Sequence, residues 1–406
     1  MFRAARWLTF GSAVSILFSI AISQSLLALA LVALLLSGAK LRIPPIRVLL
    51  GLFILGTVLA LALSDHPSEG LPQIRKLYVL LELVVVYSCL RDMRHIRWVF
   101  LTWAGFAGIT GIRGFVQFAQ KIQQARELHQ SDYSFYVGER ITGFMSHWNT
   151  FSAQEMFALT MLGAFLFFAP AARKRMWVWI LCAVLMAMAV LLAETRAVWI
   201  GTAIAALYLT WFWKRWLIAA APVVVVIAFL VSPPVIKDRF TSLLHPQGVD
   251  SNTFRIITWR TGLEMIKAHP IFGLGPEGPK YHFDEWVPAD IPRPLPVGWY
   301  GHLHNIYLQY SAERGIPTML ILVGMLFKML YDFWRALLEL PPGRSDARFL
   351  LHGGIAVILA TLAEGFFEYN LGDSEVLTMF LVVVACAYQA VPMKSERAAI
   401  GSKGSE

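Results

Sequence analysis

Long apolar segments follow one another along most of the chain, separated by short polar turns. A membrane-spanning helix needs about 20 apolar residues. Segments near that length lie at residues 46–64, 77–90, 98–118, 151–169, 176–193, 197–213, 216–232, 316–334, 349–367 and 375–391, and residues 7–37 are apolar for long enough to form a pair of short helices. The pattern predicts an all-α, polytopic membrane protein of about twelve transmembrane helices.

The polar segments divide this pattern into three regions. Residues 1–232 hold the first nine predicted helices, with a shorter external loop near 119–150, and residues 233–304 form a large loop before the C-terminal helices of residues 305–406. In the large loop, Asn252 or Thr253 could cap a helix that runs to about Ala268, where His269, Pro270 and a Gly-rich turn follow. We expect this helical loop to lie across the outer face as a lid.

Composition and charge agree with a membrane protein and give its orientation. The chain is 57% hydrophobic and 15% charged, with a mean hydropathy of +0.59, which no water-soluble domain of this size would tolerate on its surface. Basic residues gather in alternate loops: Arg3 and Arg6; Lys40, Arg42 and Arg47; Arg91, Arg94 and Arg97; Arg173, Lys174 and Arg175; Lys214 and Arg215; Arg335, Arg344 and Arg348; Lys394, Arg397 and Lys403. The positive-inside rule places these loops and both termini in the cytoplasm, and the two long loops outside.

The N-terminus and the cysteines add little chemistry. Basic residues precede an apolar run in "MFRAARWLTFGSAVSILFSIAISQ", as in a signal peptide, but no convincing cleavage site follows and we expect the segment to be retained. Cys89, Cys182 and Cys386 all lie in apolar segments, so we expect buried structural thiols rather than a disulfide or a metal site.

Several cations break the charge bias on the external side. Arg140 ends the first long loop, Arg196 occupies the tight turn "AETRAVWIG", and Arg113 and Arg75 lie near the same level. Each has an ordinary explanation, either a neighbouring carboxylate such as Glu139 or Glu194 or contact with lipid headgroups. As a group they suit a lipid diphosphate, because a guanidinium donates two charge-assisted hydrogen bonds to phosphoryl oxygens. Arg255 and Arg260, on the predicted helix of the large loop, are further candidate substrate-binding residues.

The stretch "GHLHNIYLQYSAERG", residues 301–315, supplies a titratable group at the start of a predicted helix. An unperturbed histidine can accept a proton near neutral pH, and His304 directly precedes Asn305, where the helix dipole disfavours the imidazolium. We therefore predict His304 as a general base, with Asn305 orienting its ring or capping the helix. Tyr307, Tyr310 and Arg314 recur at helical spacing and could form one polar face beside it.

The sequence contains fewer residues that indicate metal-dependent chemistry than residues that indicate a histidine base. The external loops contain no Asp-x-Asp motif and no metal-ligand triplet in sequence, which argues against a divalent cation that activates a phosphate. The segment "SDHPSEG" offers Asp65, His66 and Glu69, which an acidic-base glycosyltransferase could use, although a solvated turn explains them equally well. We expect no cofactor and no catalytic metal.

Four motifs together resemble a known family. The segments "HNIYLQYSAERGI", "ERITGFMSHWNTFSA", "AETRAVWIG" and "HPIFGLGPEG", set among about twelve predicted helices with a large loop before His304, look like the O-antigen ligase and polymerase family and the related bacterial O-linked oligosaccharyltransferases. The resemblance covers most of residues 138–316, and its most specific part is the His-Asn motif that enters a helix. The chain departs from the family pattern in having "TRAVWIG" for the commoner Ser-Arg-Gly motif and His147–Trp148 where Pro or Asn is frequent.

The resemblance implies a function, a site and a location. Family members take a glycan from undecaprenyl diphosphate at the periplasmic face of the bacterial inner membrane and transfer it to a hydroxyl, without a metal or a nucleotide sugar. By position, His304 matches the family's essential histidine, and Arg196 and Arg140 match two family arginines. The expected partners are the lipid-linked glycan donor, a lipid A core or glycan acceptor and membrane lipids, with no nucleic acid.

Two alternatives stay open at this point. A polymerase of the same family would use the growing glycan as acceptor. No residue pattern in the sequence distinguishes between the two acceptors. A transporter or flippase for a polyprenyl-linked sugar would also need many helices and cationic phosphate contacts, and it would carry ionisable residues at mid-membrane, for which Glu82 and Lys328 are the candidates.

Overall fold

The computed structural model describes residues 1–173, 175–244, 251–296 and 298–391, and of residues 75, 172, 173, 242–244, 251 and 252 the backbone alone. Helices account for 77% of the structure. The α-helices are α1 (Phe2–Ser15), α2 (Ile20–Leu36), α3 (Arg47–Ala62), α4 (Pro67–Lys76), α5 (Leu81–Cys89), α6 (Met93–Glu127), α7 (Asp132–Gly138), α8 (Trp148–Phe168), α9 (Met176–Leu192), α10 (Arg196–Lys214), α11 (Ala221–Val231), α12 (Pro234–Leu244), α13 (Ser251–Ala268), α14 (Gly278–Tyr281), α15 (Ile306–Glu339), α16 (Asp346–Glu364) and α17 (Ser374–Tyr388). Short 3-10 helices are η1 (Leu77–Leu80), η2 (Pro170–Arg173), η3 (Arg215–Ala220), η4 (Phe283–Glu285) and η5 (Asn370–Gly372).

Each apolar segment of the sequence corresponds to a helix of the bundle. In the part of the chain that the structure describes, five helical stretches are long and apolar enough to cross a membrane, namely Met93–Glu127, Trp148–Phe168, Arg196–Val231, Ile306–Glu339 and Asp346–Glu364. Four shorter apolar helices there are α2, α3, α9 and α17. The chain is therefore a helical, multi-pass membrane protein, while the number of about twelve spans stays a prediction. The exposed large side chains of α11, such as Val223, Val226 and Leu230, fit a surface covered by lipid.

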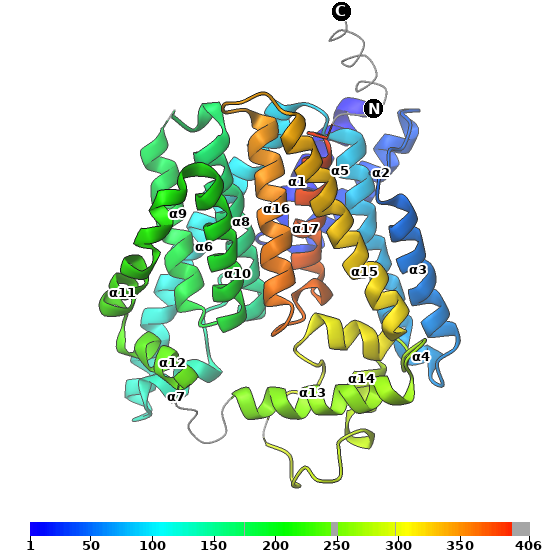
Figure 1. Cartoon of the computed structure of the whole chain (residues 1–406), viewed down its shortest axis with the longest axis vertical. Coiled ribbons are helices and arrows are strands. Elements are labelled where there is room, and N and C mark those ends of the chain that lie inside the picture. The colour runs from blue at the N-terminus through cyan, green and yellow to red at the C-terminus, as the bar shows by residue number, and fades with distance from the viewer. Residues whose placement is uncertain (174, 245–250, 297, 392–406) are drawn as a thin grey trace, which may run out of the picture.

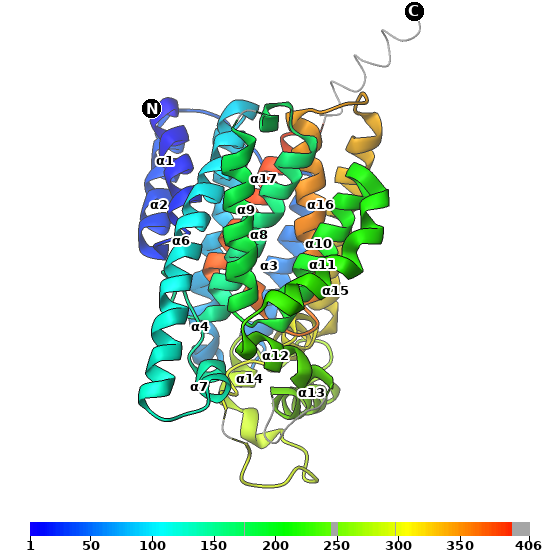
Figure 2. The same ribbon diagram turned by 90° about the vertical axis from the view of Figure 1, so that its left-hand side faces the viewer.

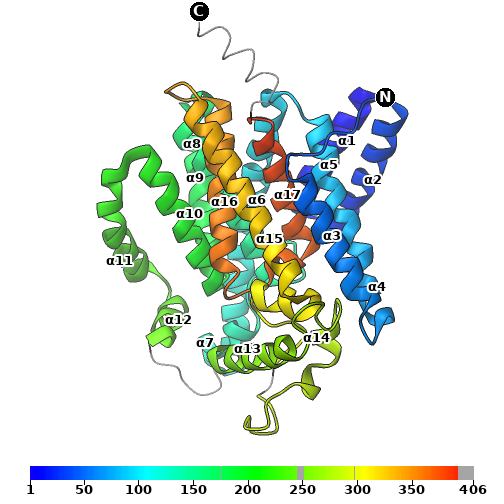
Figure 3. The ribbon, with the colours of Figure 1, turned by 45° about the vertical axis from the view of Figure 1, so that its right-hand side comes forward.

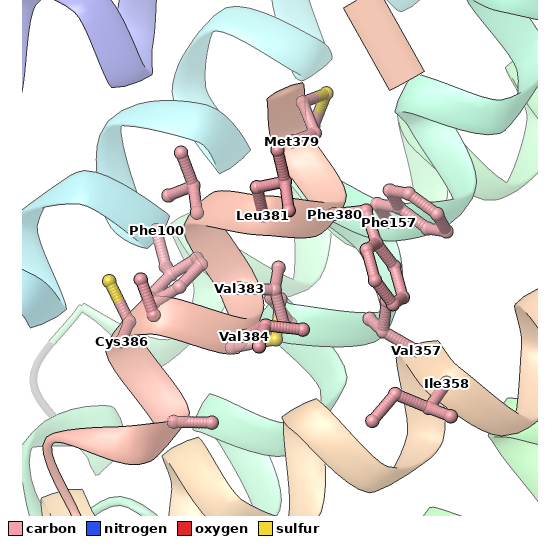
Figure 4. Close-up of a cluster of buried hydrophobic side chains, with 14 of the residues drawn as sticks. Phe100, Phe157, Val357, Ile358, Met379, Phe380, Leu381, Val383, Val384 and Cys386 are labelled. Atoms are coloured by element: carbon pink, nitrogen blue, oxygen red, sulfur yellow. The ribbon is translucent and has the colours of Figure 1, made fainter. Parts of the chain in front are cut away.

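The core of the bundle is built around α17. Its residues Met379, Phe380, Val383 and Val384 are buried, and Figure 4 shows them among side chains of three other helices. The labelled partners are Phe100 of α6, Phe157 of α8, and Val357 and Ile358 of α16. Helix α16 also packs against α8, α10 and α15. This packing holds the ends of α8, α10, α15 and α16 in fixed positions relative to one another.

The two predicted external loops gather at one end of the bundle, opposite the N-terminus (Figure 1). Helix α13 runs across this end: it lies along the lower edge in Figure 1, is seen nearly end-on in Figure 2 and again lies beneath the bundle in Figure 3. The predicted helix of the large loop and its end at Ala268 are thus confirmed, whereas the predicted cap at Asn252 or Thr253 is wrong, because the helix already begins at Ser251. The first external loop differs from its prediction, because α6 continues past residue 118 to Glu127, where Gln123 and Glu127 pair one turn apart.

A break in α15 fastens the large loop to the bundle. Gly315 has φ 78° and ψ 160° inside α15, and Pro317 follows it, so the helix cannot continue its hydrogen bonds here. The carbonyls of Ala312 and Glu313 accept instead from the N–H groups of Leu274 and Gly275, and Ile316 N–H donates to the carbonyl of Pro270. The "HPIFGLGPEG" segment therefore satisfies the backbone that the break leaves unpaired.

Candidate functional site

Five segments that are distant in sequence meet at the end of the bundle opposite the N-terminus, the end predicted to be external. They are the start of α8, the turn before α10, helix α13, the start of α15 and the turn of residues 365–373 between α16 and α17. Asn305 caps α15: its side chain accepts from the N–H groups of Tyr307 and Leu308 and donates to the carbonyl of Phe366. This cap fixes His304 beside the 365–373 turn, with His304 itself in the left-handed region at φ 48°.

His304 forms a dyad with Glu368. The Nδ1 atom of His304 lies 3.1 Å from Oε2 of Glu368, and the two side chains are 16% and 5% exposed. Because a carboxylate can only accept, Nδ1 carries the proton in a neutral His304 and Nε2 keeps its lone pair. The geometry therefore presents one ring nitrogen of His304 as a proton acceptor.

Glu368 is held by two further side chains. Nη2 of Arg255 donates to Oε1 at 2.7 Å, and Nδ2 of Asn149 donates to Oε2 at 3.1 Å. Asn149 also accepts from the hydroxyl of Thr195, the residue before Arg196, at 3.3 Å. One carboxylate thus joins α13, α8, α15 and the turn that carries Arg196.

Charge and burial set the protonation states around the dyad. Burial alone would raise the pKa of Glu368, but His304 and Arg255 outweigh it and hold that pKa well below the usual carboxyl range. Burial lowers the pKa of His302 to about 3, with His304 adding to the effect. His302 is therefore neutral, and its Nδ1 accepts from the backbone N–H of His304 at 3.1 Å. Burial also lowers the pKa of His147.

A group of four arginines surrounds this carboxylate and a second one, Glu194. Arg140, Arg196 and Arg239 are 9%, 7% and 3% exposed, and Nε of Arg239 lies 4.0 Å from Oε2 of the fully buried Glu194. Burial lowers the pKa of Arg140 to about 10, with Arg239 and Arg255 adding to the effect and Glu194 and Glu368 opposing it. Burial raises the pKa of Glu194 to about 7 in spite of Arg140, Arg239 and Arg196. We call Arg140, Arg196, Arg239 and Arg255 the arginine cluster.

The arginine cluster has unused hydrogen-bonding capacity. Among the described residues, the Nε atoms of Arg140 and Arg255 are buried without a hydrogen-bond partner, and the guanidinium of Arg140 lies over the ring of Trp148 at 5.0 Å. Four cations against two carboxylates leave the cluster positively charged. A buried site of this kind is suited to a multiply charged anion.

Two cavities flank the Glu368 carboxylate. The first, of about 340 Å³, is polar and is lined in part by Glu368 and His302. Its other lining residues are Gln73, Lys76, Ser146, His147, Asn149, Thr150, Glu277, Lys280, Trp299, Gly301, Gln309, Glu313, Tyr369, Asn370, Gly372, Asp373 and Glu375. Amides, carboxylates and exposed aromatic rings of this kind are the usual contacts of a carbohydrate.

The second cavity, of about 300 Å³, combines cations with apolar side chains. It is lined by Arg196, Ala197 and Ile200 of α10, by Arg255, Ile256 and Trp259 of α13, and by Phe367. Ile200 and Ile256 are 40% and 57% exposed, and Nε1 of Trp259 is buried without a partner among the described residues. A cavity with two arginines and an apolar lining fits an anionic head on a hydrocarbon chain.

Among the predicted site residues whose side chains the structure describes, Arg196 and Arg255 alone line these cavities. Arg113 donates to the carbonyl of Gly143 at 2.7 Å, and Arg260 pairs with Asp290 on the surface. Arg314 pairs with Glu313 and lies over Tyr310, whereas Tyr307 donates to the carbonyl of Leu362. The predicted polar face of α15 is therefore divided between two sets of partners. Arg75 belongs to α4, and its side chain lies outside the part that the structure describes.

Sequence reasoning missed two residues of the site. Glu368 follows a predicted membrane helix in "EGFFEYN", and Arg239 lies on a short loop helix, so neither stands in a motif. The signal for Glu368 was its acidic side chain at a short external turn of an otherwise apolar region. Arg239 carried no comparable signal, because it lies in the middle of a loop helix and not at the end of a predicted membrane helix.

Comparison with known proteins gives a match for the middle of the chain. Residues 181–323 match the O-antigen ligase family model, a region that contains Arg196, Arg239, Arg255 and His304. No curated protein matches the chain. The match agrees with the family that the sequence motifs indicated: residues 181–323 of this chain are similar to the O-antigen ligase family.

Proposed function

We propose that the protein transfers a glycan from undecaprenyl diphosphate to a hydroxyl of lipid A core, at the periplasmic face of the bacterial inner membrane. The observation that carries the proposal is the His304–Glu368 dyad, whose carboxylate connects a polar cavity to a cationic, apolar one through Arg255. Glu368 lines the first cavity, and its partner Arg255 lines the second. A donor and an acceptor bound in the two cavities would meet at this dyad.

The donor fits the cavity between α10 and α13. Arg196 and Arg255 would bind the diphosphate, with Arg140 and Arg239 adding positive charge behind them. Ile200, Ile256, Trp259 and Phe367 would contact the first isoprene units. Exposed apolar residues on α10 and α11 give the remaining polyprenyl chain a surface in the lipid.

The acceptor would occupy the polar cavity, whose lining includes Glu368, the partner of His304. Nε2 of His304 takes the proton of that hydroxyl as the oxygen attacks the anomeric carbon. The bond between the anomeric carbon and the diphosphate oxygen breaks, and the polyprenyl diphosphate leaves with the electron pair. Attack from the face opposite the diphosphate inverts the anomeric configuration. Glu368 stabilises the imidazolium that forms, as a carboxylate does beside a catalytic histidine.

Two alternatives predict different observations. A polymerase would use the same chemistry, and the lipopolysaccharide banding of a deletion strain separates the two, because loss of a ligase removes all O-antigen bands whereas loss of a polymerase leaves one repeat unit. A flippase would need free ionisable groups at mid-membrane, but Glu82 accepts from Ser12 and Lys328 pairs with Asp332 one turn away. The chemistry at the dyad favours transfer over transport.

The substitution Glu368→Gln tests the proposal. Glutamine keeps the shape of the side chain but cannot neutralise an imidazolium, so we expect the initial rate of transfer by the purified protein to fall by about 10²-fold or more. Asp290→Asn is the matched control, because Asp290 also pairs with an arginine of α13 but on the exposed surface. Equal rates for the Glu368→Gln protein and the control would overturn the role of the dyad.

A further inference from the structure

A second cluster of metal-binding side chains lies away from the arginine cluster. It contains His66, at the start of the α4 region, Glu69 of α4, and His282, between α14 and η4. One ligand atom from each residue lies within 4.8 Å of the others. The sequence did not reveal it because Glu69 and His282 are 213 positions apart.

The geometry of the cluster is close to that of a metal site. Nε2 of His282 lies 3.0 Å from Oε2 of Glu69, and the rings of His66 and His282 stack with centroids 4.6 Å apart. Ligand atoms at zinc distances in a tetrahedral site are separated by about 3.3 Å. His66 is exposed, so the cluster is open to an ion and to water from the solvent side.

A fourth residue gives the second, independent observation. Nδ1 of His282 lies 2.9 Å from Oε1 of Glu285, so the ring nitrogen that does not face Glu69 has a carboxylate partner. Metal-binding histidines almost always donate this second N–H to a carboxylate, a carbonyl or water, which fixes the tautomer and the ring. The arrangement therefore has both the ligands and the supporting contact of a metal site.

From this arrangement we propose that His66, Glu69 and His282 bind a Zn²⁺ ion, with water completing the coordination. Two imidazoles and one carboxylate are a common zinc ligand set. The ion would join α4 to the α14–η4 segment, which also meet where Gln73 donates to Glu277. Gln73, Lys76, Glu277 and Lys280 of these two segments line the polar cavity. The ion thus holds one wall of that cavity and takes no part in the transfer step.

The cluster at the dyad, His302, His304 and Glu368, is a less suitable site for a cation. Both oxygens of Glu368 already accept hydrogen bonds, from Arg255, Asn149 and His304. Nδ1 of His302 accepts from a backbone N–H, and the arginine cluster would repel a cation. These contacts make His302 a suitable control for the zinc site.

The test is metal binding by the full chain in detergent, purified with a tag that contains no histidine and stripped with chelator. We expect titration with Zn²⁺ to show one site per chain by calorimetry and to raise Tm with increasing metal concentration. Titration with Co²⁺ should give the visible absorption bands of a tetrahedral site. His66→Ala and His282→Ala should abolish these signals, Glu285→Gln should weaken affinity by about 10- to 100-fold, and His302→Ala should leave them unchanged.

Two outcomes would overturn the zinc site. One is the absence of a Zn²⁺-dependent change in Tm together with the absence of Co²⁺ bands in the wild-type chain. In that case His282 carries a proton on both ring nitrogens and donates to Glu69 and Glu285. The other is metal binding that survives both His66→Ala and His282→Ala. Neither result bears on the transferase proposal, since these measurements do not use donor or acceptor.

Discussion

At the scale of single residues, the site depends on carboxylates that are shared. Glu368 bonds to His304, Arg255 and Asn149, and a buried charge of this kind is tolerated only when it is fully paired. Glu194 is different, because neither of its buried carboxylate oxygens has a hydrogen-bond partner in the part of the chain that the structure describes. The first carboxylate fixes geometry, whereas the second adjusts the net charge of the arginine cluster.

Replacing Arg196 or Arg140 by lysine tests the assignment of the arginine cluster to a diphosphate. Lysine keeps the charge but cannot donate two parallel hydrogen bonds, so we expect transfer to fall severely, by about 10-fold or more, with the protein still inserted and folded. Arg260→Lys is the control, because Arg260 forms an exposed pair with Asp290. Wild-type rates in both Arg196→Lys and Arg140→Lys, measured with the purified donor, would contradict the assignment.

Glu194 predicts how donor binding depends on pH. Because burial raises its pKa to about 7, Glu194 is neutral below that pH and adds a negative charge to the cluster above it. A diphosphate is repelled by that charge, so KM for the donor should rise by several-fold from about pH 6 to about pH 8.5. Glu194→Gln should remove this rise, which steady-state kinetics at several pH values would detect. A pH dependence that Glu194→Gln leaves unchanged would assign the titration to another group.

At the scale of elements, the broken helix α15 connects the large loop to the site. The break at Gly315 lets the "HPIFGLGPEG" segment pair with the backbone of residues 312–316, and the other end of the same short helix carries Asn305 and His304. Movement of the loop is therefore expected to displace His304, the proposed general base. The glycine is required here because a Cβ at position 315 would lie 1.8 Å from the carbonyl oxygen of Ile271.

Gly315→Ala should consequently lower Tm and the transfer rate together. The substitution forces a side chain into a backbone conformation and a space that accept only glycine. Gly324→Ala, on the same helix, is the matched control, since a Cβ there meets no atom within 4 Å. Thermal unfolding in detergent and initial rates compare the two. A Gly315→Ala protein as stable as the control would show that the docking of the loop does not depend on the break.

The helices themselves could be predicted from the sequence, because a run of apolar residues long enough to cross a bilayer has few other solutions. The start of α15 was also predictable, since Asn305 is a common capping residue. The partners of His304 were not. Glu368 reaches the site only because α15 and α16 pack side by side, and Arg239 only because α12 folds back beneath the turn of residues 193–195. Such contacts depend on tertiary packing rather than on local pattern.

At the scale of the whole molecule, the bundle gives two different surroundings to one dyad. Helices α10 and α13 form a cationic cavity with an apolar lining, and α4, α14 and the 365–373 turn contribute to a polar one. In the proposed function, the donor lipid remains in the membrane while the acceptor enters the polar cavity. Separate cavities of this kind would allow transfer between a lipid-linked glycan and a hydroxyl.

The central claim is that His304 is the general base. The most direct test is the initial rate of transfer as a function of pH, measured for wild type, His304→Ala and His302→Ala at matched expression. Removing a general base costs about 10² to 10⁴ in rate, so His304→Ala should be nearly inactive. His302 accepts from the backbone of His304 and is neutral, with a pKa of about 3. His302→Ala should therefore keep much of its activity and the wild-type pH profile. The opposite result, an inactive His302→Ala protein and an active His304→Ala protein, would contradict the account.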